Sequence, residues 1–98
     1  MAPRTLHITN DYGESVQVKV LPQGSATSDD IIVDNNDTRS LAIRGNIFME
    51  PHDCEVRIFV CKLGENTPTE QLTIESGRNA VNVTIKKGNT GPAIFLAE

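Results

Sequence analysis

Apolar and polar residues alternate along short segments of this 98-residue chain, and turn-forming clusters separate the segments at near-regular intervals. Residues 15–20 read Ser-Val-Gln-Val-Lys-Val, and residues 80–86 read Ala-Val-Asn-Val-Thr-Ile-Lys. A period of two places successive side chains on opposite faces of the backbone, which is typical of half-buried β-strands. This alternation is the strongest constraint in the sequence, and it predicts an all-β fold.

Strand-like segments lie at residues 5–9, 15–21, 31–33, 38–49, 54–63, 71–75, 80–87 and 92–97. Their number and spacing match an immunoglobulin-like sandwich of about one hundred residues, although the chain has no Trp. A small jelly roll or a partly closed barrel fits the same pattern. We therefore predict a single small antiparallel β-sandwich, immunoglobulin-like or jelly-roll-like, with seven to eight strands. Residues 1–98 form one domain in this interpretation, with residues 1–4 as a flexible N-terminal arm.

Two turn clusters predict hairpins between consecutive strands. Residues 10–14 contain Gly13 and separate the first two segments, and residues 76–79 read Ser-Gly-Arg-Asn. Short Gly-containing links between alternating segments are typical of β-hairpins. We expect hairpin pairing across both turns.

The segment at residues 54–63 is apolar on both faces. Val56, Ile58 and Val60 share one parity, whereas Phe59 and Cys61 share the other. A strand of this kind is usually central in its sheet or covered on both faces. We expect Val56, Ile58 and Val60 to belong to the core.

Cys54 and Cys61 lie in this same segment, with no turn residue between them. At 3.3 Å per residue they would be about 23 Å apart, whereas a disulfide needs Cα atoms closer than about 7 Å. Both are therefore expected to be free thiols, unless one pairs with a neighbouring chain. Together with the lack of a signal-peptide pattern, this predicts a soluble cytoplasmic protein, secreted only if a leader was removed.

The composition favours neither nucleic-acid binding nor catalysis. The net charge is −4, and Lys86 and Lys87 form the one adjacent basic pair. Phosphate binding needs clustered Lys and Arg, and a zinc site needs closer Cys or His spacing. His52, Asp53 and Cys54 would have to converge from a turn and a strand to form a nucleophile. We expect no enzyme activity, no catalytic residue, no cofactor and no transmembrane segment.

Oxygen-rich side chains flank residues 31–33 and are the metal candidates of the sequence: Asp29, Asp30, Asp34, Asn36 and Asp37. Ca²⁺ takes six to eight oxygen ligands. An EF-hand is excluded, because Arg39 stands where the loop needs Gly and Gly45 where it needs Glu. Asp and Asn are also the common residues of turns. We expect turns here, with weak cation association only.

Two function classes follow. The first is a non-catalytic protein-interaction or structural module, which binds a partner protein or a second copy through a sheet face, a loop end or a strand edge. The alternative is a lectin-like domain for carbohydrate or another ligand, with or without Ca²⁺. Sugar sites stack rings on exposed aromatic residues, and Tyr12 is the one plausible exposed aromatic of the sequence, a scarcity that counts against this alternative. No motif connects the chain to a known family.

Overall fold

The computed structural model describes residues 4–24, 26–43, 55–68, 70–74 and 80–97. The described residues form eight strands: β1 (Arg4–Asn10), β2 (Val16–Pro22), β3 (Asp29–Val33), β4 (Thr38–Ile43), β5 (Val56–Lys62), β6 (Glu70–Ile74), β7 (Ala80–Lys87) and β8 (Pro92–Ala97). The predicted all-β class and strand number are confirmed.

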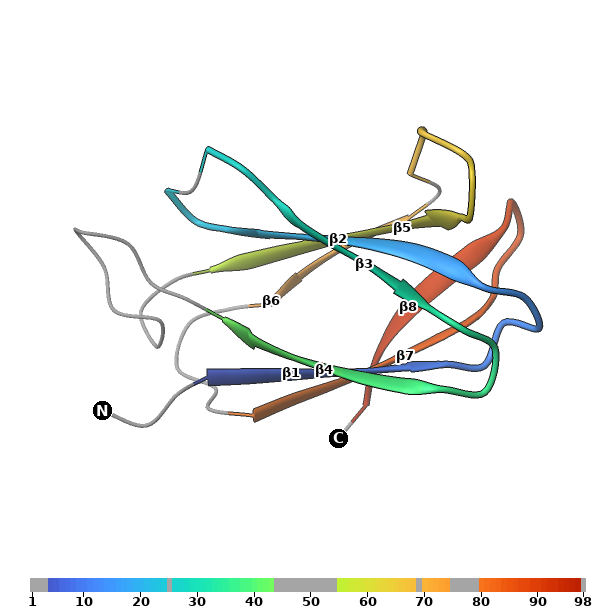
Figure 1. Cartoon of the computed structure of the whole chain (residues 1–98), viewed down its shortest axis with the longest axis horizontal. Coiled ribbons are helices and arrows are strands. Elements are labelled where there is room, and N and C mark those ends of the chain that lie inside the picture. The colour runs from blue at the N-terminus through green and yellow to red at the C-terminus, as the bar shows by residue number, and fades with distance from the viewer. Residues whose placement is uncertain (1–3, 25, 44–54, 69, 75–79, 98) are drawn as a thin grey trace.

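The strands form a β-sandwich of two four-stranded sheets (Figure 1). Sheet A has the order β4-β1-β7-β8, and sheet B has the order β3-β2-β5-β6. Sheet B is antiparallel throughout, but β1 pairs in parallel with β7 in sheet A. The sandwich is therefore as predicted, whereas its purely antiparallel character is not. A parallel pair between distant segments leaves no local pattern, because its strands need a long crossover rather than a turn.

Both hairpins predicted from the turn clusters are wrong. β1 belongs to sheet A and β2 to sheet B, and β6 and β7 are separated in the same way. The consecutive pairs that do form are β2–β3, β5–β6 and β7–β8. Alternation specifies which face of a strand is buried, but it does not specify the neighbouring strand.

Two further details depart from the sequence-based picture. Arg4, expected in a flexible arm, is the first residue of β1 and pairs with Ile43 of β4. The first two strands share a sheet in the immunoglobulin constant fold, whereas β1 and β2 lie in opposite sheets here.

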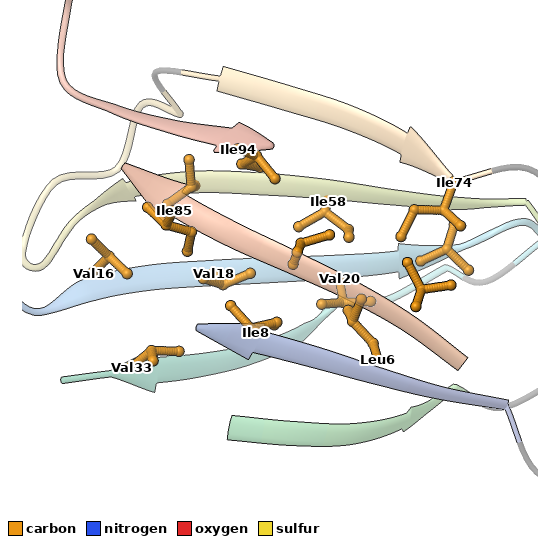
Figure 2. Packing of buried hydrophobic residues seen from close by; sticks show 14 of the residues in the cluster. Leu6, Ile8, Val16, Val18, Val20, Val33, Ile58, Ile74, Ile85 and Ile94 are labelled. Carbon is orange, nitrogen blue, oxygen red and sulfur yellow. The ribbon is translucent and has the colours of Figure 1, made fainter. Parts of the chain in front are cut away.

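The core lies between the sheets and is built from aliphatic side chains of alternating positions (Figure 2). Val56, Ile58 and Val60 are at most 1% exposed, as predicted, and β5 is central between β2 and β6. From sheet A, Leu6 and Ile8 of β1 contribute fully buried side chains to the same cluster. The two sheets pack against each other through the faces that carry these buried side chains.

Candidate interaction surface

A tight turn attaches β8 to β7 and fixes its register. The Gly88 N–H donates to the Gly91 carbonyl at 2.7 Å, and Lys87 pairs with Pro92. A Cβ on Gly88 would lie 2.8 Å from the Ala93 Cβ, which is closer than two carbons can approach. Gly91 has φ 140°, a conformation that L side chains rarely adopt. The turn therefore requires both glycines, and it sets where β8 begins.

β8 is an edge strand, and within the described part of the chain it pairs with β7 alone. Its alternation directs Ile94 into the core, where this side chain is 6% exposed. Phe95 points to the outer side of sheet A and is 50% exposed, and Leu96 is 38% exposed. The outer edge of β8 thus has no second strand beside it among the described residues, and it carries two large apolar side chains.

No charged residue lies on β8, whose sequence is Pro-Ala-Ile-Phe-Leu-Ala. The other three edge strands each carry charge: β3 has Asp29 and Asp30, β4 has Arg39 and β6 has Glu70. Soluble proteins usually protect edge strands with charged residues, bulges or covering loops. Among the described residues, the starting proline of β8 is the one feature that resembles such protection, so β8 is the edge best suited to accept another strand.

The outer face of sheet A beside Phe95 is polar but nearly uncharged. Thr84 of β7 stands directly opposite Phe95, and Thr9 and Thr38 continue the same row across β1 and β4. The Thr9 and Thr38 hydroxyls are 3.0 Å apart. In the neighbouring row His7 Nδ1 lies 2.7 Å from Ser40 Oγ. Depletion of charge is typical of protein interfaces rather than of a fully solvated surface.

The structure separates the sequence-predicted metal candidates into two groups. Asp29 and Asp30 begin β3, whereas Asp34, Asn36 and Asp37 follow its other end. Among the described residues, no group of three or more His, Cys, Asp or Glu side chains is placed to hold a metal ion.

Local hydrogen bonds engage three of these acidic side chains. Asp30 accepts from the Ser28 hydroxyl, and Asp34 accepts from the Ser15 hydroxyl, each at 2.9 Å. The Asp37 carboxylate accepts from the Thr38 N–H at 2.9 Å. Asn36 has φ 63°, the left-handed conformation that Asn tolerates in turns. Asp34, Asn36 and Asp37 thus build the loop that joins β3 to β4.

Tyr12, the predicted exposed aromatic, belongs to the core and is only 7% exposed. Its N–H donates to the Asn10 side-chain oxygen at 2.9 Å, which holds the β1–β2 loop against the sandwich. The expectation of an exposed ring at Tyr12 is therefore wrong. Among the described residues, the most exposed aromatic side chain is instead Phe95, which was not a candidate from the sequence. The alternation in β8 predicts that Phe95 faces away from Ile94, but it does not predict whether another element covers the Phe95 ring.

Cys61 is a free thiol and only 1% exposed. Its Sγ atom donates to the Glu65 carbonyl at 3.3 Å, so the loop after β5 lies against it. Burial raises the pKa of the Cys61 thiol, and nearby Lys19 acts in the opposite direction. The prediction of a free thiol is confirmed for Cys61. Cys54, His52 and Asp53 lie outside the described residues.

A pocket of about 250 Å³ opens where the β2–β3 loop approaches β5. It is lined by Gln23, Gly24, Glu55, Arg57 and Thr73. The Gln23 side-chain oxygen accepts from the Glu55 N–H at 3.2 Å. Small-molecule sites are typically larger, roughly 300–1,000 Å³, and mostly apolar, so this polar hollow is a poorer candidate than the β8 edge.

Comparison with known proteins extends the description of the fold but not of the function. No family model matches the chain, and no curated protein matches it. The solution NMR structure of a protein from Eubacterium rectale is similar, with a TM-score of 0.60 over 99% of this chain and 90% of that one. The two sequences are 11% identical, so the likeness concerns the fold alone. Within the described residues, no helix has the length and apolar character needed to cross a membrane.

Proposed function

We propose that this protein is a non-catalytic interaction module that binds another polypeptide chain by strand addition at the free edge of β8. The observation that carries the proposal is an uncharged edge strand on which Phe95 is 50% exposed and Leu96 38% exposed. In strand addition, main-chain hydrogen bonds supply affinity and alternate side chains supply specificity. The outer edge of β8 offers main-chain groups for such hydrogen bonds, and its side chains Phe95 and Leu96 offer contacts for specificity.

The proposal of a non-catalytic role is supported by the surroundings of the one imidazole that the structure describes. His7 Nδ1 lies 2.7 Å from Ser40 Oγ, a combination that occurs in nucleophilic sites. Here the pair lies on the outer face of sheet A, with β1 paired on both sides. The β1 backbone N–H groups are engaged in those ladders and are not free to stabilise an oxyanion. A cross-strand polar pair is the simpler role for His7 and Ser40.

A displayed library of random heptapeptides tests strand addition without knowledge of the partner. Selection on the wild-type protein should enrich peptides rich in β-branched and aromatic residues. These peptides should lose binding to Phe95→Lys, which places a charge on the edge strand. Ile32→Lys is the matched control, because Ile32 is 48% exposed on β3, an edge strand that already carries two Asp. Failure to enrich peptides, or equal binding to both variants, would contradict the proposal.

A second candidate function, glycan binding, is favoured by a separate observation. Phe95 adjoins a face that offers the Asn82 amide and the Thr84 hydroxyl, with Thr84 directly opposite Phe95. An aromatic ring beside neutral hydrogen-bonding groups suits a sugar. A glycan array probed with Ca²⁺ and with chelator would test it. Asn82→Ala should abolish a specific glycan signal but leave peptide binding at the β8 edge unchanged.

A further inference from the structure

Five of the six residues of β8, positions 93–97, form a sequence that is symmetric under reversal of chain direction. Residues 93–97 read Ala-Ile-Phe-Leu-Ala, and the reversed order Ala-Leu-Phe-Ile-Ala has the same class of side chain at every position. A twofold interface requires a surface that is complementary to itself. An antiparallel strand pair centred on one residue meets this requirement when the sequence on both sides of that residue matches.

We propose that the partner of β8 is the β8 strand of a second copy, paired antiparallel about a twofold axis at Phe95. This inference rests on the proposed function and names its partner. The register places Phe95 opposite Phe95, and Ile94 opposite Leu96 of the other copy. The two four-stranded sheets A then join edge to edge into one continuous sheet.

The faces of the side chains agree with this register. Directly opposed residues of an antiparallel pair lie on the same face of a sheet. Both Phe95 rings would therefore meet on the outer face, in a row that continues through Thr84 of each copy. Leu96, exposed by 38%, would pack beside the other copy's Ile94, which already faces the core. The pairing covers the two exposed apolar side chains of β8 at once.

The absence of charged residues favours β8 over the other edge strands as the strand that pairs with its own copy. No ionisable side chain of residues 92–97 enters the new ladder, so no like charges are opposed. Lys86, the nearest cation on the outer face, lies in the row of Ala93. In the joined sheet this row continues through the other copy's Ala97 to its Asn82, which is neutral. Self-pairing of β3 would instead bring Asp29 and Asp30 of both copies into one ladder.

Sedimentation tests the dimer. A six-residue edge is a small interface, so we expect a concentration-dependent dimer rather than a permanent one. The wild-type protein and Ile32→Lys should move from monomer to dimer over roughly a hundredfold range of concentration. Phe95→Lys should stay monomeric throughout. Circular dichroism of each variant confirms that it is folded.

Disulfide trapping tests the register. Phe95→Cys places two thiols opposite each other, with Cα atoms about 4.5–5.5 Å apart, within the range of a disulfide. In Leu96→Cys the two thiols are diagonal, about 7–8 Å apart, and outside that range. Under mild oxidation Phe95→Cys should form a covalent dimer at least tenfold faster than Leu96→Cys. The wild-type protein, with its native cysteines, gives the background rate.

Each contrary result has a distinct meaning. A wild-type protein that is monomeric at every concentration overturns the self-pairing but leaves strand addition to another chain, which the peptide library tests separately. A dimer that persists in Phe95→Lys overturns the role of the β8 edge altogether. A dimer in which Leu96→Cys cross-links as fast as Phe95→Cys overturns the twofold at Phe95.

Discussion

The Asn10 side-chain amide donates to the Val33 carbonyl at 2.8 Å and thereby ties the end of β1 in one sheet to the end of β3 in the other. The same amide donates to the Glu14 carbonyl at 2.7 Å, and its oxygen accepts from the Tyr12 N–H. Asn10 is 0% exposed and is the buried polar residue of the described core. Both polar atoms of the Asn10 side chain therefore form hydrogen bonds, and these bonds link the two sheets at this end of the sandwich.

Replacement of Asn10 by Ala should be strongly destabilising. The substitution removes three hydrogen bonds and leaves the Val33 carbonyl without its side-chain donor, so we expect a loss of about 2–4 kcal/mol in the free energy of unfolding. Urea unfolding measures it. The control is Asn35→Ala, which removes one exposed bond from the Gly13 N–H and should cost under about 1 kcal/mol. Equal losses in the two variants would contradict the role assigned to Asn10.

In the core, Ile58→Ala should cost about 2–5 kcal/mol, because it leaves a cavity in the packed centre of sheet B. Ile58 is 1% exposed on the central strand β5. Ile32→Ala makes the same chemical change at a side chain that is 48% exposed, and should cost under about 1 kcal/mol. A loss under about 1 kcal/mol for Ile58→Ala would place β5 at the surface instead.

The turn before β8 should not tolerate a side chain at Gly88. A Cβ there would lie 2.8 Å from the Ala93 Cβ and 3.1 Å from the Gly91 carbonyl oxygen. We expect Gly88→Ala to destabilise the protein by about 1–3 kcal/mol and to shift the amide NMR signals of β8. Thr90→Ala, at an exposed position of the same turn, should change neither. Wild-type stability in Gly88→Ala would show that the turn can rearrange.

Alkaline pH should weaken the fold through Cys61. Burial raises the pKa of this thiol in the folded state, so the unfolded chain loses its proton at lower pH, near the ordinary value of 9.0. The stabilising contribution is therefore complete below that pH and declines as the pH rises toward the folded pKa. Urea unfolding at several alkaline pH values should give a steeper decline for wild type than for Cys61→Ala. Identical slopes would show that Cys61 is not the group responsible.

Ca²⁺ should leave the thermal stability unchanged. Asp34 and Asp37 accept local hydrogen bonds, and Asp29 and Asp30 lie at the other end of β3. A ligand at one hundred times its dissociation constant would add about 2.7 kcal/mol of stability. Thermal melts with Ca²⁺ and with chelator should therefore coincide. A rise of several degrees with Ca²⁺ would instead support the Ca²⁺-assisted form of the glycan-binding alternative.

The sequence alone determined the strands and their buried faces. Val16, Val18 and Val20 face the core because a period of two fixes the orientation of each side chain relative to its neighbours. The same rule identified Val56, Ile58 and Val60. This information is local, since it depends only on residues two positions apart.

Strand neighbours, by contrast, were decided by the tertiary structure. The loop between β1 and β2 has the composition of a hairpin turn, yet it crosses from one sheet to the other and is held there by Asn10. The parallel pairing of β1 with β7 joins residues more than seventy positions apart in the chain. The exposure of Phe95 and the burial of Tyr12 follow from this arrangement, because a ring is covered or left open by whatever strand or loop lies beside it. The alternation of apolar and polar residues does not specify which strand or loop lies beside a side chain. The candidate interaction edge could therefore be located only in the folded chain.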